Sequence, residues 1–140
     1  QTPVSLLFEA PESAPVRVIS HASRPAFWQG AREGSARLVL TVPGVEPVEV
    51  WTWALHAGEE YVSHPHPAGV REVITVVTGT LTLTVGGEAH DLPAGTTVFF
   101  AADHTHSYAA TAEDCEFLMQ VHLPASHGSG GAPHQLPESA

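Results

Sequence analysis

The sequence contains no lysine. All five basic residues are arginine, against fifteen aspartates and glutamates, and the formal net charge is −10. Schiff-base chemistry needs a lysine amine, so it is excluded. Nucleic-acid binding needs a basic surface that neutralises phosphates, so we expect this chain itself to bind neither DNA nor RNA.

Cysteine and long apolar runs are equally scarce. The single cysteine, Cys115, excludes an internal disulfide and is typical of a reducing compartment. No segment approaches the roughly 18 apolar residues of a membrane helix, and no signal-peptide pattern is visible. We therefore expect a cytoplasmic protein without membrane contact. The chain begins with Gln1 rather than Met, and we expect that a preceding segment has been trimmed or left out.

Helical periodicity is also absent, and short strands take its place. Trp51, Trp53 and Leu55 alternate with other residues, and three threonines alternate with apolar residues in segment 80–85. This period of two, with glycine and proline at the corners, predicts an all-β sandwich or barrel. The expected strands are 16–19, 26–29, 36–42, 48–56, 72–78, 80–85, 88–92, 96–101, 106–109 and 115–123.

The 140 residues are expected to form one domain. Residues 1–15 carry Pro11 and Pro15 and are predicted to form a linker. Residues 16–123 are predicted to form the folded domain. Residues 124–140 are rich in serine, glycine, proline and histidine, which predicts a disordered tail.

The chemistry is concentrated in one histidine-rich stretch. His64 and His66 lie two residues apart, so on an extended backbone both rings face one side. A proline follows each of them and keeps the backbone extended. Glu72 comes next in the chain, and His106 is a fourth candidate. Neutral imidazoles with a carboxylate suit one divalent ion such as zinc, iron, nickel or manganese. The alternatives are ordinary core or surface histidines, and a Glu72 that pairs with Arg71.

Three further residues are candidates for a ligand pocket. Tyr108 shares the face of His106 and could offer its hydroxyl to a bound molecule, with a core tyrosine as the alternative. Trp53 is a candidate for the pocket wall or for the core, and His104 for the pocket or for a solvated loop. Glu59 and Glu60 are expected to face solvent.

These residues resemble the cupin superfamily. Its first motif reads Gly, five residues, His-x-His, three or four residues, Glu, six residues, Gly. Its second reads Gly, five residues, Pro-x-Gly, two residues, His, three residues, Asn. The first motif is matched by Gly58, His64, His66, Glu72 and Gly79, except that five residues separate His66 from Glu72 instead of three or four. In the second, only Gly95 and His106 match, while Ala101, Asp103 and Ala110 stand in the other slots. The resemblance implies a cupin jelly-roll β-barrel (double-stranded β-helix) with its pocket in the barrel mouth, and leaves the function open.

A narrower resemblance covers most of the chain. The chain is similar to the C-terminal cupin domains of bacterial XRE-type helix-turn-helix regulators. The similarity lies in Trp51 and Trp53 and in the segments 66–69, 86–87 and 100–108. Residues 2–9 resemble the end of such a DNA-binding domain. The resemblance implies a sensor for a small-molecule ligand, expected to be a homodimer, with DNA bound only through a missing N-terminal domain.

The other interpretation is a small mononuclear metalloenzyme, a dioxygenase or an isomerase. A metal with open coordination positions can bind oxygen or polarise a substrate. Apart from the metal ligands, Tyr108 and His104 are the only evident candidates for a general base. This favours the sensor over the enzyme.

Overall fold

The computed structural model describes residues 15–125. The predicted DNA-binding-domain end at 2–9 and nearly all of the predicted disordered tail lie outside this range. The described part is built from strands, with one short 3₁₀ turn, η1 (His21–Ser23). It contains no helix of the length and apolarity needed to cross a membrane.

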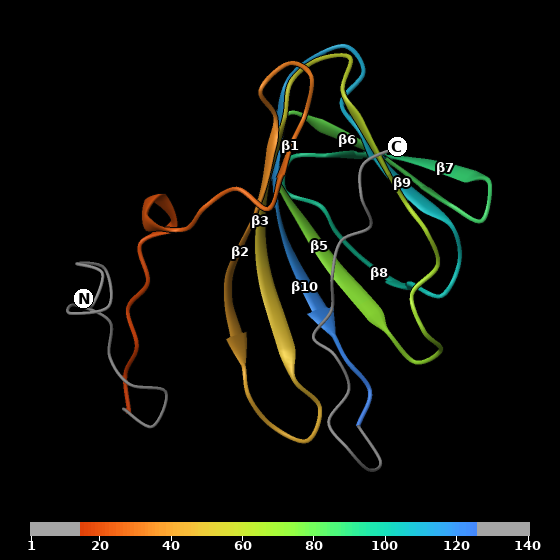
Figure 1. Ribbon diagram of the computed structural model, residues 1–140. Coiled ribbons are helices and arrows are strands. Elements are labelled where there is room, and N and C mark those ends of the chain that lie inside the picture. The colour runs from red at the N-terminus through yellow and green to blue at the C-terminus, as the bar shows by residue number, and fades with distance from the viewer. Residues whose placement is uncertain (1–14, 126–140) are drawn as a thin grey trace.

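Two antiparallel sheets face each other and form the predicted jelly-roll barrel (Figure 1). The six-stranded sheet has the order β1 (Trp28–Gln29), β2 (Ser35–Val42), β3 (Val48–Leu55), β10 (Cys115–His122), β5 (Arg71–Thr78), β8 (Thr97–Ala101). The four-stranded sheet has the order β4 (Glu60–Ser63), β9 (His106–Ala109), β6 (Thr80–Val85), β7 (Glu88–Pro93). The all-β jelly-roll fold predicted from the sequence is confirmed.

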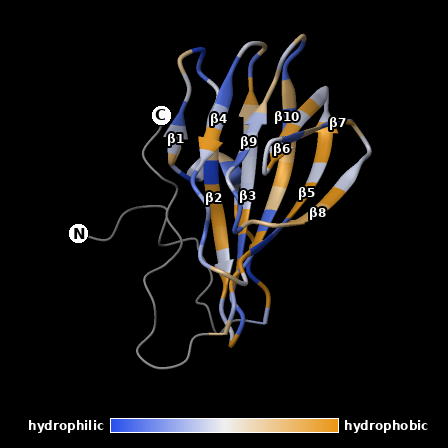
Figure 2. Ribbon diagram, turned by 90° about the vertical axis from the view of Figure 1, so that its right-hand side faces the viewer, coloured by the Kyte–Doolittle hydropathy of each residue, from blue (hydrophilic) through white to orange (hydrophobic). Residues whose placement is uncertain are grey.

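The core fills the space between the sheets. Inward side chains of neighbouring strands lie in rows, such as Trp51, Met119 and Ile74 on β3, β10 and β5, all at most 1% exposed. Figure 2 shows the corresponding alternation of hydrophobic and hydrophilic residues along the strands. Each fully buried large apolar side chain contributes about 1.5–3 kcal/mol, which gives the site a rigid frame.

Two strand predictions were wrong. Residues 16–19 form no strand, and Val16 and Val18 are exposed, because no neighbouring strand pairs with them. Strand β4 was not predicted, although its residues alternate between exposed and buried. Its four residues are too few to show a clear period before the prolines that follow.

Glycines close the corners as predicted. Gly86 and Gly87 connect β6 to β7 in a two-residue hairpin, with φ of 56° and 87°. Both values lie in the left-handed region required by the favoured hairpin turns. Gly79 has φ of 72°, and a Cβ there would lie 2.0 Å from the carbonyl oxygen of Asp114. No other residue fits between β5 and β6.

Glu59 does not face solvent, contrary to expectation, whereas Glu60 does. Glu59 is 6% exposed, and its carboxylate accepts backbone N–H bonds from Arg32 at 2.8 Å, Gly34 at 3.2 Å and His56 at 2.8 Å. A single carboxylate therefore ties the β1–β2 turn to the β3–β4 turn. Glu60 begins β4 and Glu59 directly precedes it, and adjacent residues of an extended chain turn their side chains to opposite faces.

Candidate metal centre

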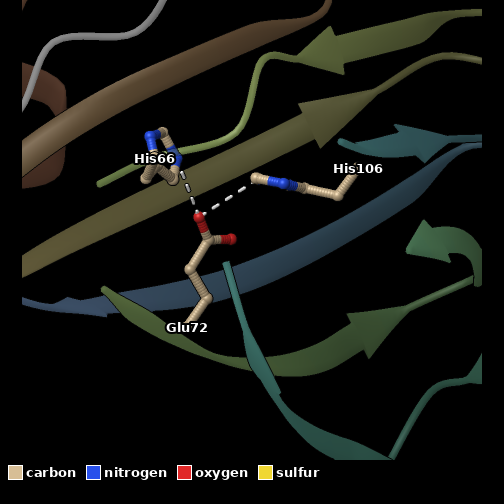
Figure 3. Close-up of side chains that lie close together, drawn as sticks. All are labelled: His66, Glu72 and His106. Carbon is tan, nitrogen blue, oxygen red and sulfur yellow. Dashed lines mark ion pairs between the residues drawn. The ribbon is translucent and has the colours of Figure 1, made fainter. Parts of the chain in front are cut away.

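Three side chains from separate parts of the sequence meet inside the barrel (Figure 3). His66 comes from the loop between β4 and β5, Glu72 from the second position of β5, and His106 from the first position of β9. One oxygen of the carboxylate, Oε2 of Glu72, lies 3.2 Å from Nε2 of His66 and 3.3 Å from Nε2 of His106. The three donor atoms all lie within 4.8 Å of one another. Such a cluster of two imidazoles and one carboxylate is a donor set for a divalent ion.

The backbone fixes each of these side chains. Glu72, Ile74 and Val76 are buried in alternation on β5, so Glu72 points into the barrel. His66 lies in a loop, but its N–H donates to the carbonyl of Ala102 at 3.0 Å. The loop is thereby held against the segment that leads into β9.

Burial gives the cluster its electrostatic character. Glu72 is 0% and His106 1% exposed, and the side chain of His66 is 7% exposed. Burial alone would raise the pKa of the Glu72 carboxyl, but its contacts with His106, His66 and Tyr108 outweigh burial and lower that pKa to about 2. Burial would lower the pKa of His106, and the neighbouring Glu72 outweighs this effect and raises it. Glu72 is therefore a carboxylate at neutral pH.

The hydrogen bonding of His106 fixes which of its ring nitrogens is available. Nδ1 lies 2.7 Å from the carbonyl oxygen of His104. A carbonyl can only accept, so Nδ1 carries the hydrogen, and in the neutral ring Nε2 presents a lone pair.

The Nε2 lone pair of His106 faces Oε2 of Glu72, a carboxylate oxygen that can also only accept a hydrogen bond. Within residues 15–125, neither Nε2 of His106 nor Oε2 of Glu72 has an aligned hydrogen-bond partner. Two acceptors 3.3 Å apart repel each other unless a cation lies between them. A proton would convert His106 to imidazolium, and a metal ion would bind both atoms. The donor set and the tautomer thus fit a divalent metal.

Tyr108 holds the other oxygen of the carboxylate. Its hydroxyl donates to Oε1 of Glu72, and both side chains are buried. Burial, followed by the charge of Glu72, raises the pKa of Tyr108 well above its usual value, so the hydroxyl keeps its proton. Tyr108 therefore orients Glu72 so that Oε2 turns toward the two imidazoles.

The remaining predicted site residues lie elsewhere. His64 is exposed and is not part of the cluster. His104 is also exposed, and its Nε2 lies 3.4 Å from Asp103. Trp53 is 2% exposed and packs against Tyr108 with ring centroids 4.9 Å apart. The structure thus brings together three of the four predicted ligands, and Arg71, the alternative partner of Glu72, instead lies over the Phe99 ring.

The motif spacing contained a signal for this arrangement. With His66 in the first histidine slot, Ala68 takes the second, and three residues separate Ala68 from Glu72, as the motif allows. Gly79 keeps its slot, with six residues between it and Glu72, while Glu60 stands where the motif has its first glycine. The centre then has one imidazole fewer than the full motif provides.

Comparison with known families agrees with the fold. The sequence model of the cupin domain family matches residues 51–121, just over half of the chain. The chain therefore belongs to the cupin family.

Similar proteins include transcriptional regulators. The HTH-type transcriptional regulator SutR of Escherichia coli (strain K12) is 43% identical over 65 residues, which are 46% of this chain and 36% of SutR. The crystal structure of the Cupin_2 domain of an XRE family transcriptional regulator from Enterobacter cloacae has a TM-score of 0.56 and 25% identity, and the match covers 65% of this chain and 97% of that one. An HTH_3 family transcriptional regulator from Vibrio cholerae has a TM-score of 0.56 and 27% identity, over 64% of this chain and 51% of that one. The match spans about a third of SutR. These similarities confirm the resemblance to cupin domains of XRE-type regulators.

Proposed function

We propose that this chain is the ligand-sensing domain of a transcriptional regulator, with one divalent metal held by His66, Glu72 and His106. The observation that carries the metal assignment is the pair of facing acceptor atoms, Oε2 of Glu72 and Nε2 of His106, 3.3 Å apart. Zinc, iron, nickel and manganese all accept such a donor set. When bound, the metal supplies a Lewis-acidic centre with coordination positions left open for an external ligand.

The sensor assignment rests on the relatives and on charge. The similar proteins are named as HTH-type, XRE family and HTH_3 family regulators. With a net charge of −10, the chain itself is unsuited to DNA. We therefore assign DNA binding to an N-terminal domain of the complete regulator, and cytoplasmic location and homodimerisation belong to the same proposal. A ligand would control such a protein only if it binds two conformations with different affinity.

A metalloenzyme is the second candidate, because the open positions would equally serve a dioxygenase or an isomerase. Its difficulty is that residues 15–125 place no free general base at the centre. The Tyr108 hydroxyl donates to Glu72 and keeps its proton, and His104 is on the surface. We therefore favour the sensor.

The decisive experiment measures metal content. The chain, prepared without chelator and dialysed against zinc, iron, nickel or manganese, should retain up to one ion per chain by elemental analysis. H106A and E72Q should lose most of it, since each leaves an incomplete ligand shell. The exposed histidines give matched controls, and H64A and H104A should bind metal as the wild type does. A wild type without metal, or equal loss in H64A and H106A, would contradict the assignment. Multiple turnover of a small organic acid by the metal-loaded chain would support the enzyme instead.

A further inference from the structure

A cavity of 420 Å³ lies between the edge strands β7 and β8, where the four-stranded and six-stranded sheets meet. Figures 1 and 2 both show these strands on the side of the barrel away from β1 and β2. The cavity is lined by Leu83, Val85, Gly86, Glu88, His90, Leu92, Val98, Phe99 and Phe100.

The lining is mostly apolar. Leu83 is buried in the core, and Val85, Leu92 and Val98 pack partly buried against it. The titratable side chains in the lining are Glu88 and His90, which lie 3.1 Å apart and are 79% and 47% exposed. The lining thus offers no arginine and no unpaired cation to a polyanion.

The cavity shares its walls with the candidate metal centre. Phe100 of β8 lies opposite Glu72 of β5, and Val85 of β6 lies opposite His106 of β9. The Phe100 ring is 9% exposed, and its centroid lies 5.4 Å from that of His106. Phe100 therefore contacts both the cavity and His106, one of the three proposed ligands.

We propose that this cavity binds the apolar part of the sensed ligand, a small organic molecule with a ring or branched chain and no more than one charged group. The inference rests on the proposed sensor function and names its ligand class. A cavity of this volume lies within the usual range of about 300–1,000 Å³ for small-molecule sites. A molecule bound in the cavity contacts the Phe100 ring, which in turn packs against His106. Binding in the cavity therefore changes the surroundings of the proposed metal centre. The apolar walls offer few partners for the polar groups of sugars, phosphates and dicarboxylates, so we expect none of these to bind in the cavity.

Two simple compounds test this chemistry. We would titrate ¹⁵N-labelled protein with p-cresol, a neutral ring, and with succinate, a dianion without an apolar group, and follow amide and His106 ring signals by NMR. Both titrations are run on metal-free and on zinc-dialysed protein. We expect saturable shifts with p-cresol in β6, β7 and β8 and at His106, in both metal states, and none with succinate on metal-free protein.

Variants that fill the cavity give the control. V98F places a ring on the inner face of β8, where Val98 lies opposite the buried Ile74, and should weaken p-cresol binding by at least about tenfold. L92F fills the cavity from β7 and keeps the test decisive if V98F does not fold. A101F adds the same ring at an exposed position of β8 outside the cavity lining, and should leave binding unchanged.

The outcomes separate this inference from the metal proposal. Three results would overturn the cavity assignment alone. They are zinc binding without saturable p-cresol shifts, an affinity of metal-free protein for succinate equal to that for p-cresol, and unchanged p-cresol binding in both V98F and L92F. Saturable p-cresol binding that V98F or L92F abolishes, in a protein that takes up no metal, would support the cavity and refute the metal centre.

Discussion

The hydroxyl of Tyr108 donates a hydrogen bond to Oε1 of Glu72 in the closed interior of the barrel. Tyr108 and His106 are two residues apart on β9, so this strand supplies both a proposed ligand and the group that orients the carboxylate. Mutation of a group that hydrogen-bonds a metal ligand typically lowers metal affinity by about 10–100-fold.

Removing that hydroxyl should weaken the site without removing a ligand. In Y108F the ring packing against Trp53 and Phe117 is kept, but the buried carboxylate loses its donor. We expect zinc affinity to fall by about 10–100-fold and the free energy of unfolding of the metal-free protein to fall by about 1–3 kcal/mol. Isothermal titration calorimetry and urea unfolding measure the two effects. Wild-type zinc affinity in Y108F would show that Tyr108 is only a core residue.

Metal binding should weaken in acid. A metal needs the lone pair at Nε2 of His106, and a proton competes for it. A free imidazole has a pKa near 6.5, and Glu72 raises the pKa of His106. Protons therefore begin to compete with the metal at a higher pH than they would at a free imidazole. Affinity should therefore fall as pH is lowered through neutrality, by about tenfold per pH unit for each proton displaced. Competition titrations with a chromophoric chelator across this range measure the slope. Occupancy that is constant from neutral to mildly acidic pH would show that these histidines are not ligands.

The carboxylate of Glu59 should make stability depend on acid pH. Burial alone would raise its pKa, but the backbone bonds from His56, Arg32 and Gly34 outweigh it and lower the pKa from 4.5. A carboxyl with a depressed folded-state pKa stabilises the fold above the unfolded-state pKa, and this contribution is lost as pH falls through the folded value. E59Q should therefore lower the free energy of unfolding at neutral pH by about 1–3 kcal/mol, and the difference from wild type should shrink below about pH 4.

The adjacent residue provides the control for this experiment. Glu60 is exposed, so E60Q should change stability by less than about 0.5 kcal/mol in urea unfolding at neutral pH. Equal effects of E59Q and E60Q, or an E59Q effect independent of pH, would show that the carboxylate does not hold the two turns.

The fold was predictable because a period of two marks strands such as β3, where Trp51 and Trp53 leave little choice of inward face. The site was predictable in its chemistry and only in part in its geometry. His64 and His66 satisfy the same local pattern, and the backbone bond from His66 to Ala102 that selects one of them joins residues 36 positions apart. The position of Phe100 beside the cluster could not be predicted, because it depends on β8 pairing with β5 next to Glu72. Cys115 is fully buried, since strand alternation alone determines its face.

The isolated chain should not bind DNA. Three of its five arginines already serve the fold. Arg32 donates to the carbonyl of Ala57, Arg37 donates to the carbonyl of Arg24, and Arg71 lies over the Phe99 ring. With a net charge of −10 and no lysine, the surface should repel the phosphate backbone, whose neutralisation supplies essentially all non-specific affinity. Fluorescence anisotropy with a labelled duplex at low salt, where attraction is greatest, should show no binding. Binding that weakens with added salt would show that this chain, and not only an N-terminal domain, contacts DNA.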